Sequence, residues 1–192
     1  MKRTLDSTYL TVQRDLFESG LVAQIGPNSF SVWNAIKCHA DFNTGLCFPG
    51  MRSIGKKVGL SPASVQRAIT CLIDHHLLRI VSPHGKKRGQ TYIARERLDV
   101  KVGGMVVCTV VMDYIPTKIS STLDKLKKDF AEGRSDAFSL VEIIPGKGFD
   151  FDASTGNFKK EIKVNLSHQN RSVAGILKGF KKDESFNLIH KQ

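Results

Sequence analysis

Two short amphipathic segments meet at the sequence GLSP, residues 59–62. Glycine enters the left-handed conformation at little cost and often ends a helix there. Serine caps the start of a following helix, and proline suits its first turn, where a missing N–H is not needed. The break therefore predicts two helices joined by a tight turn, the first over residues 51–58 and the second over residues 62–75.

Each of the two predicted helices has an apolar side and an outer side, at the spacing that amphipathic helices show. The apolar positions are Met51, Ile54 and Val58 in the first helix, and Val65, Ile69, Leu72 and Ile73 in the second. The outer positions are Arg52, Lys56 and Lys57 in the first helix, and Ala63, Ser64, Gln66, Arg67 and Thr70 in the second. Two short helices with a glycine in their turn are typical of the helix-turn-helix unit.

Residues 29–42 predict a further helix before this pair, because their apolar residues share one helical face. These residues are Val32, Trp33, Ile36 and Ala40. Ser29 or Ser31 is expected to cap the start of this helix. Trp33 is expected in the hydrophobic core, since it lies on the apolar stripe.

A β-hairpin is predicted directly after the helix pair. Residues 77–82 and residues 91–94 are rich in strand-forming side chains, and glycines bound the segment between them. The tip of the hairpin carries Lys86, Lys87 and Arg88. A basic hairpin in this place corresponds to a wing, whose charge is expected to lie along phosphates or in a minor groove.

Positive charge is concentrated in this part of the chain. The whole chain has 29 Lys and Arg residues against 18 Asp and Glu residues, a formal net charge of +11. Residues 51–98 hold ten basic side chains against two acidic ones, a net charge of +8. The ten are Arg52, Lys56, Lys57, Arg67, Arg79, Lys86, Lys87, Arg88, Arg95 and Arg97. A local field of this sign indicates a polyanionic partner such as nucleic acid, although an anionic membrane surface would fit the charge equally well.

Residues 10–98 resemble the helix-turn-helix (winged-helix) domain of plasmid and phage replication proteins and related regulators. The resemblance is carried by W-x-A-I-x-x-H-A at residues 33–40, G-x-C-F-P at residues 45–49 and G-L-S-x-x-S-V-x-R at residues 59–67. It implies that the domain binds double-stranded DNA through the helix over residues 62–75 and the wing. These motifs are specific for the fold and do not distinguish replication from repression.

The expected DNA contacts follow from how such a domain docks. The second helix presents its N-terminal side chains to the major groove, and the first helix crosses the backbone. Gln66 and Arg67 have the donors and acceptors that discriminate base edges. Arg79 has an alternative role, an ion pair with Asp74. The predicted DNA-binding residues are Arg52, Lys56, Lys57, Ser61, Ala63, Ser64, Gln66, Arg67, Thr70, Lys86, Lys87 and Arg88.

The second half of the chain predicts a strand, a helix, another strand and a hairpin. Their expected ranges are residues 105–116, 117–133, 138–146 and 148–166. The helix has one apolar face made by Ile119, Leu123, Leu126 and Phe130, and the last strand of the hairpin alternates at Ile162, Val164 and Leu166. This order predicts one helix packed on a mostly antiparallel sheet.

The chain is therefore predicted to be an α+β protein in three parts. Residues 1–100 form the winged helix-turn-helix domain. After a short KVGG hinge, residues 104–166 form a small α+β domain for dimerisation or partner contact. Residues 167–192 are a basic tail whose apolar spacing fits a short amphipathic helix.

Acidic residues in the second half of the chain are the basis of an alternative hypothesis, in which this half is a metal-dependent enzyme that acts on DNA. Asp150 and Asp152 would share one strand face, with Asp113 and Glu142 as candidate neighbours. Exposed solubilising charge is the commoner role of such residues, and no Gly-rich phosphate loop or paired nucleophile accompanies them. We therefore expect no catalytic residues, no cofactor and no enzymatic activity.

The cysteines do not predict a metal site. Cys38, Cys47, Cys71 and Cys108 show no C-x-x-C pairing, so neither a zinc ribbon nor a disulfide framework is indicated. His39 is beside Cys38, and His75 and His76 follow Cys71, but no ligand spacing supports bound metal. Reduced, mostly buried thiols are expected.

No segment approaches the ~20 consecutive apolar residues of a membrane span, and no signal-peptide pattern is present, so a cytoplasmic location is predicted. The leading hypothesis is a site-specific double-stranded DNA-binding protein of a plasmid, phage or similar element. It would act as a homodimer and serve as a transcriptional regulator or replication factor. Residues 104–192 are a candidate binding region for a protein partner. The alternative is an interaction or inhibitor module that uses a basic winged helix to bind protein.

Overall fold

The structure, a computed structural model, describes residues 10–81, 90–102, 104–132, 136–147, 151–152 and 157–158. The chain forms two compact units. The first contains the chain up to Glu96 together with Asp113–Thr117, and the second contains Arg97–Met112 and the chain from Lys118 onward. The chain therefore passes between the two units three times: after Glu96, after Met112 and after Thr117.

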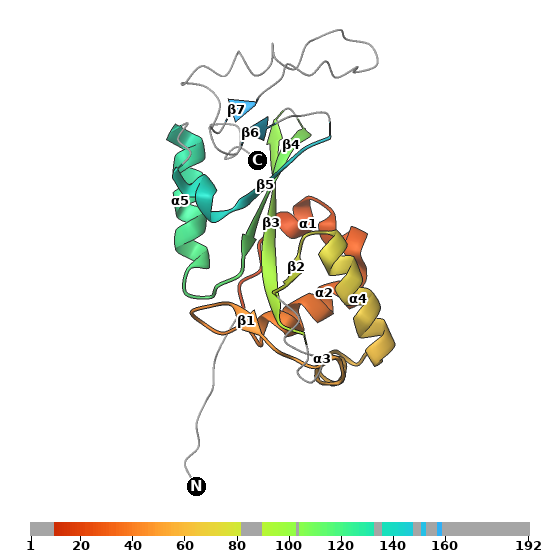
Figure 1. The fold of residues 1–192 in the computed structure, drawn as a ribbon. Coiled ribbons are helices and arrows are strands. Elements are labelled where there is room, and N and C mark those ends of the chain that lie inside the picture. Colours follow the sequence, from red (N-terminus) through yellow and green to blue (C-terminus); the bar gives the residue numbers. More distant parts are fainter. Residues whose placement is uncertain are drawn as a thin grey trace, which may run out of the picture. The chain divides into compact units, whose positions relative to one another are not determined.

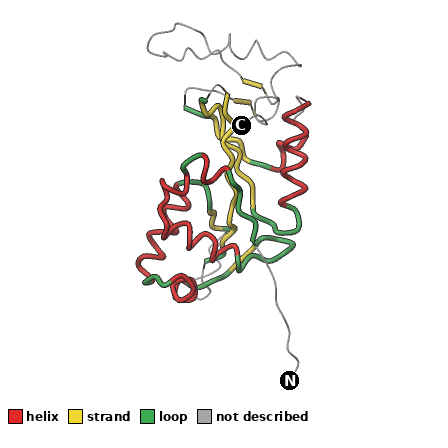
Figure 2. The backbone as a smooth tube through the Cα atoms, turned by 180° about the vertical axis from the view of Figure 1, so that it is seen from behind, coloured by secondary structure: helices red, strands yellow, loops and turns green. Residues whose placement is uncertain are grey.

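Four helices make up most of the first unit (Figure 1), and Figure 2 shows them on one side of the strands in this unit. They are α1 (Asp15–Glu18), α2 (Leu21–Lys37), α3 (Met51–Val58) and α4 (Pro62–Asp74). Helix α2 packs against both α3 and α4, which also pack against each other. The predicted helix pair α3–α4 is thus supported by one longer helix.

Helix α2 begins earlier than the sequence predicts and is interrupted near its start. Gly26 has φ 77° and ψ 163°, which is not helical, and Pro27 follows it without an N–H group. A second helical segment therefore begins at Pro27 and continues to Lys37. Ser29 and Ser31 lie inside this segment, so the prediction that one of them caps the helix is wrong. The glycine and proline before them already start the helix.

The other end of α2 also differs from the prediction. The helix ends at Lys37, so Ala40 lies beyond it and not on its apolar stripe. The carboxylate of Asp41 accepts the N–H groups of Asn43 at 3.1 Å and Thr44 at 2.9 Å. An aspartate that bonds to the backbone ahead of it offers the chain an alternative to the helix, which explains the earlier end.

The turn between α3 and α4 is confirmed, and it depends on two glycines. Gly59 follows α3 in the left-handed conformation, at φ 71°. The N–H of Leu60 donates to the carbonyl of Gly55 at 2.9 Å, and a β-carbon on Gly55 would overlap the carbonyl oxygen of Leu60. Ser61 then caps α4, because its hydroxyl accepts the N–H of Ser64 at 3.2 Å.

The apolar sides of α2, α3 and α4 meet in one hydrophobic core. Trp33 is fully buried, and its indole N–H donates to the carbonyl oxygen of Arg95 at 3.2 Å. The other core side chains on these helices are Val32, Ile36, Ile54, Val65, Ala68, Ile69 and Leu72. The predicted stripes of α3 and α4 are therefore the buried ones, with Met51, Val58 and Ile73 half-buried at the edge.

A buried ion pair lies at the C-terminal end of α2. The side chains of Lys37 and Glu96 are fully buried, with Nζ and Oε1 2.5 Å apart. The same Nζ donates to the carbonyl of Thr11 and lies 4.2 Å from the ring centre of Trp33 and 4.0 Å from that of Tyr114. Burial lowers the pKa of Lys37 and raises the pKa of Glu96, while their mutual attraction opposes both shifts. The ammonium charge of Lys37 is therefore stabilised by the Glu96 carboxylate and by the faces of two aromatic rings.

The strands of the predicted hairpin are present. Strand β2 (Leu78–Ile80) pairs antiparallel with β3 (Tyr92–Val102), with Leu78 opposite Ala94 and Ile80 opposite Tyr92. The short strand β1 (Leu46–Cys47) also pairs with β3. The predicted hairpin tip, with Lys86, Lys87 and Arg88, lies outside the described residues.

The second unit contains the rest of β3, from Arg97, and the elements that follow it. They are β4 (Met105–Asp113), α5 (Ile119–Glu132), the 3-10 helix η1 (Asp136–Leu140), β5 (Glu142–Pro145), β6 (Phe151–Asp152) and β7 (Asn157–Phe158). β4 neighbours β3 and pairs antiparallel with β5, with Val110 opposite Ile143. β6 and β7 form a separate antiparallel pair.

Several expectations for the second half need correction. KVGG is not a hinge between domains, because its Lys101 and Val102 belong to β3 and β4 begins at Met105 in the same unit. The strand expected over residues 138–146 begins only at Glu142, since the residues before it form η1. Phe130 belongs to α5, as predicted. Ile162, Val164 and Leu166, and the tail over residues 167–192, lie outside the described residues.

The predicted α+β class is confirmed: helices dominate the N-terminal region, and an antiparallel sheet with a helix follows. The division of the chain is not the expected one near residue 100. Strand β3 continues through residue 100 without interruption. The first unit ends at Glu96 and also includes residues 113–117. The N–H of Tyr114 donates to the carbonyl of Ala94 at 2.8 Å, which shows why this returning segment belongs with the first unit.

Candidate nucleic-acid interface

The outer face of α4 is exposed where the sequence predicts DNA contacts. Gln66, Arg67 and Thr70 are exposed, as are Ser61 and Ala63, and Ser64 is half-buried. The reason is the helical repeat, since the buried stripe of α4 occupies the opposite side. These six residues form what we call the α4 face.

Local hydrogen bonds organise the α4 face. A guanidinium N–H of Arg67 donates to the hydroxyl of Ser64 at 3.2 Å, and that hydroxyl lies 3.0 Å from the hydroxyl of Ser61. The Thr70 hydroxyl donates to the backbone carbonyl of Gln66 at 3.2 Å. Within the described residues the side-chain amide of Gln66 makes no hydrogen bond. Its donors and acceptor are therefore available to a base edge.

Helix α3 adds an exposed basic surface next to this face. Arg52, Lys56 and Lys57 are exposed, and none of them forms an ion pair within the part of the chain that the structure describes. Exposed cations on the first helix of such a pair suit contacts to a phosphate backbone.

Some of the arginines that contribute to the local charge are paired with a carboxylate. The guanidinium of Arg79 donates two hydrogen bonds to the carboxylate of Asp113, at 2.9 and 2.6 Å, and Arg95 lies 3.5 Å from the same carboxylate. Arg79 therefore pairs with Asp113 and not with Asp74, the partner considered from sequence. Fork-like pairs of this kind are geometrically specific.

Arg97 shows the same behaviour in the second unit, where it lies 3.3 Å from the carboxylate of Asp99. Asp99 also accepts the hydroxyl of Thr109 at 2.7 Å. The net charge counted over residues 51–98 omits Asp99 and Asp113, because both lie outside that window. Three of the ten basic side chains counted there thus have acidic partners, and the count overstates the field at the α4 face.

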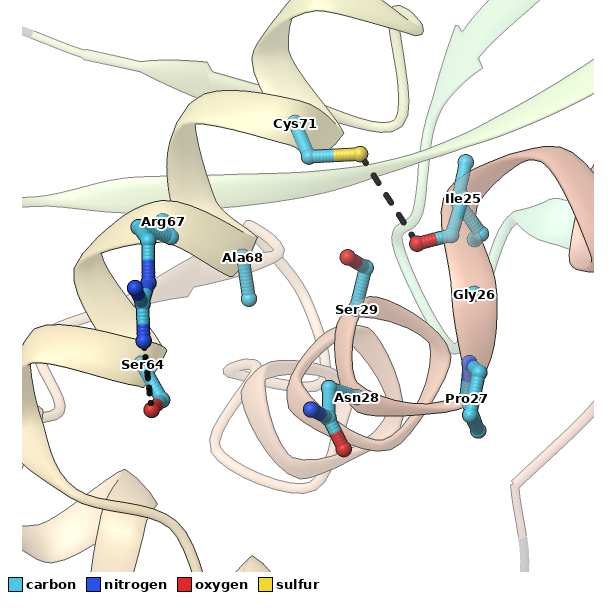
Figure 3. A pocket seen from close by; sticks show the side chains of 9 residues that line it. All are labelled: Ile25, Gly26, Pro27, Asn28, Ser29, Ser64, Arg67, Ala68 and Cys71. Atoms are coloured by element: carbon cyan, nitrogen blue, oxygen red, sulfur yellow. Dashed lines mark hydrogen bonds between the residues drawn. The ribbon is translucent and has the colours of Figure 1, made fainter.

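The groove between α2 and α4, about 380 Å³ in volume, was not predicted from the sequence (Figure 3). It is shallow and open. Its lining residues are Ile25, Gly26, Pro27, Asn28, Ser29, Ser64, Arg67, Ala68 and Cys71. Two of these, Ser64 and Arg67, also belong to the α4 face, so the groove borders the predicted interface. The only sequence signal for it is the Gly26-Pro27 pair that interrupts α2.

His39 lies close to the basic residues of α3. It is half-buried, and its Nε2 atom is buried without a hydrogen-bond partner among the described residues. Burial lowers the pKa of His39, and the nearby Lys57 ammonium lowers it further. The imidazole is therefore neutral at pH 7 and adds no positive charge to this surface.

The structure brings no metal-binding cluster together in its described parts: no group of three or more His, Cys, Asp or Glu side chains lies in reach of one ion. Asp113 is held by two arginines, and Asp150 lies outside the described residues. Cys47 and Cys108 are buried, and burial raises the pKa of their thiols to about 12 and about 11.

The family model of a helix-turn-helix domain matches residues 23–78. No curated protein and no solved structure matches the chain. The N-terminal region of this chain therefore contains a helix-turn-helix domain, as predicted. The match begins in α2 and ends in β2, so it contains α3, the glycine turn and α4. Among the described residues no helix is long and apolar enough to cross a membrane.

Proposed function

We propose that this helix-turn-helix domain binds a specific double-stranded DNA sequence, with α4 in the major groove. The observation that carries the proposal is the exposed α4 face directly after the Gly59 turn and the Ser61 cap. Helix-turn-helix domains present this part of their second helix to base edges. Gln66 and Arg67 supply hydrogen-bonding groups that distinguish base pairs, and Thr70 and Ala63 offer small contacts at the same surface.

The backbone contacts proposed for this domain come from two places. Arg52, Lys56 and Lys57 of α3 supply exposed cations beside the α4 face. Lys86, Lys87 and Arg88, which follow β2 in the sequence, are proposed to add contacts as the tip of the wing. Phosphate contacts position a protein on DNA and carry most of its salt dependence, whereas base contacts select the sequence.

We further propose that the chain serves a plasmid, phage or similar element, as a transcriptional regulator or a replication factor. The support is the resemblance of residues 10–98 to domains of such proteins. The second unit would mediate dimerisation, since a two-fold protein suits two half-sites one helical turn apart. Light scattering of the full chain, alone and with its duplex, tests the dimer.

The experiment that tests sequence reading is selection of bound duplexes from a random pool, followed by a salt titration on the enriched duplex. The proposal expects one enriched motif, bound at least ~10³-fold more tightly than random duplex at the same salt concentration. Enrichment of no motif, together with a steep salt dependence, would contradict sequence reading and leave an electrostatic binder.

A protein-interaction module is the second candidate, and the pairing of two arginines with an aspartate favours it. Arg79 and Arg95 have Asp113 as partner, so the exposed positive charge is smaller than the sequence implies. This candidate expects weak binding to every duplex and a stoichiometric complex with a protein. Measured duplex affinity at physiological salt separates the two functions, because non-specific binding alone gives dissociation constants of about 10⁻⁴ to 10⁻⁶ M.

We propose no catalytic activity for the second unit. The carboxylate of Asp113 accepts hydrogen bonds from Arg79, which ties it to the first unit and away from the role of metal ligand. Incubation of the full chain with DNA and magnesium is expected to leave the DNA intact. Cleavage that the double change Asp150→Asn and Asp152→Asn abolishes would overturn this view.

A further inference from the structure

The groove between α2 and α4 is lined by polar and cationic groups that base reading by α4 does not require. One wall is the interrupted start of α2, with Asn28 and Ser29, and the other is α4, with Ser64 and Arg67 (Figure 3). None of its nine lining residues is acidic, and one of them is a cation. The groove therefore favours an anion.

The α2 wall is the N-terminus of a helical segment. Gly26 is not helical and Pro27 has no N–H, so a helical segment restarts here. The first turn of a helix generally has N–H groups without intrahelical acceptors. The segment continues to Lys37, and a helix of this length carries a partial positive charge of roughly +0.5 at its start. Asn28 and Ser29 stand in that first turn.

Ser29 supplies an independent observation. Its side chain is buried, with 6% of the residue exposed, and its hydroxyl points into the space between α2 and α4 (Figure 3). This hydroxyl makes no hydrogen bond to any described part of the chain. Ser29 is not among the described residues whose enclosed polar side-chain atoms lack a partner, so its hydroxyl is open to the groove and can donate to an acceptor placed there.

The α4 wall supplies the cation. One guanidinium N–H of Arg67 donates to Ser64, and a guanidinium has five such donors, so the others remain for a ligand and for a base. Arg67 is exposed at the rim, where the groove meets the α4 face. A shallow open groove does not enclose a small molecule, but it accepts a group that projects from a larger surface.

We propose that this groove binds one phosphate group of the DNA backbone, with donors from Ser29, Asn28 and the first turn after Pro27, and with Arg67 at its rim. The inference rests on the proposed function, because the phosphate belongs to the duplex that α4 reads. The contact fixes α4 against one strand and is independent of base sequence. It adds to the phosphate contacts proposed for α3 and the wing.

The test compares two charge changes on the same helical segment. Asn28 and Ser31 are both exposed, but only Asn28 lines the groove. Asn28→Asp is expected to weaken binding to the selected duplex and to random duplex by about tenfold relative to Ser31→Asp, because the new carboxylate repels the phosphate. Ser29→Ala, with Ser31→Ala as control, is expected to weaken both duplexes equally by a smaller factor, and thermal melting confirms that each variant is folded.

Ethylation of single phosphates locates the contact on the duplex. One phosphate whose ethylation blocks binding of the wild-type chain is expected to lose that effect in Asn28→Asp. Equal affinities of Asn28→Asp and Ser31→Asp, with wild-type DNA binding intact, would overturn the groove assignment alone. A wild-type chain that binds no duplex would instead overturn the proposed function.

Inorganic phosphate provides the last comparison, by calorimetric titration of the wild-type chain and Asn28→Asp. Weak binding or none is expected, because a single free phosphate lacks the other contacts of a duplex. Binding that Asn28→Asp abolishes, combined with unchanged DNA affinity of that variant, would assign the groove to free phosphate and overturn the backbone assignment.

Discussion

At the scale of single residues, Gln66 is the side chain whose loss should affect sequence reading most selectively. Its amide is exposed and unbonded within the described residues. Gln66→Ala is expected to cost about 1–3 kcal/mol on the selected duplex and much less on random duplex. Binding titrations on both duplexes at one salt concentration measure the difference.

Lys56→Ala is the matched change on α3, where the exposed ammonium faces no acidic partner in the described chain. We expect it to weaken all duplexes by a similar factor and to reduce the slope of log affinity against log salt by about 1. If Gln66→Ala and Lys56→Ala show the same loss on every sequence, the division between base reading and backbone contact is wrong.

His39 gives a pH dependence whose direction follows from its surroundings. Burial and Lys57 lower its pKa in the folded state, so the unfolded chain binds a proton more readily at this position. The contribution of neutral His39 to stability is complete above the model-peptide value of 6.5 and is lost as the pH falls through it toward the lower folded value. Urea unfolding at pH 7.5 and pH 5.5, on wild type and His39→Asn, is expected to show a smaller loss in the variant. An equal loss in both would assign the pH dependence to other groups.

At the scale of elements, the turn between α3 and α4 depends on two glycines for different reasons. Gly59 needs a positive φ, whereas Gly55 needs the absence of a β-carbon beside Leu60. Gly59→Ala is expected to destabilise the chain by about 1–2 kcal/mol, and Gly55→Ala by roughly 1–3 kcal/mol through a backbone shift.

Gly50→Ala is the control for these two changes. Gly50 has an extended backbone, at φ −71° and ψ 148°, and a β-carbon there would meet nothing within 4 Å. Its replacement should change the free energy of unfolding by less than about 0.5 kcal/mol. Chemical denaturation of the three variants decides the comparison, and a large effect of Gly50→Ala would contradict the assignment of the turn.

The same elements show what the sequence can and cannot predict. The turn, the Ser61 cap and the exposed α4 face follow from residues within a few positions of one another, so local patterns were sufficient. The start of α2 was missed because a Gly26-Pro27 pair usually ends a helix, and here it restarts one. The partner of Arg79 is 34 residues away, at Asp113, and no local pattern indicates it.

At the scale of the whole molecule, the pair of Lys37 and Glu96 joins residues that are 59 positions apart. Removing either partner leaves a buried charge without compensation, so Lys37→Met and Glu96→Leu are each expected to cost about 3–5 kcal/mol. The double change Lys37→Met with Glu96→Leu should recover much of this loss, because a buried pair is rarely better than packed apolar side chains.

Chemical denaturation of the two single variants and the double variant gives the coupling free energy of the pair. Duplex affinity below the unfolding transition serves as the control, since neither residue belongs to the α4 face. Additive losses in the double variant would show that the two side chains do not act as a pair.

The burial of Lys37 also determines when the N-terminal region can finish folding during protein synthesis. A nascent chain that has just completed α4 holds every residue of the glycine turn, but Glu96 and the ring of Tyr114 are still missing. The ammonium of Lys37 has no buried site until both have left the ribosome, and domains generally fold as units during translation. A ribosome stalled with only residues 1–100 released should therefore carry an N-terminal region that contains α1 to α4 but is more sensitive to protease than in the full chain.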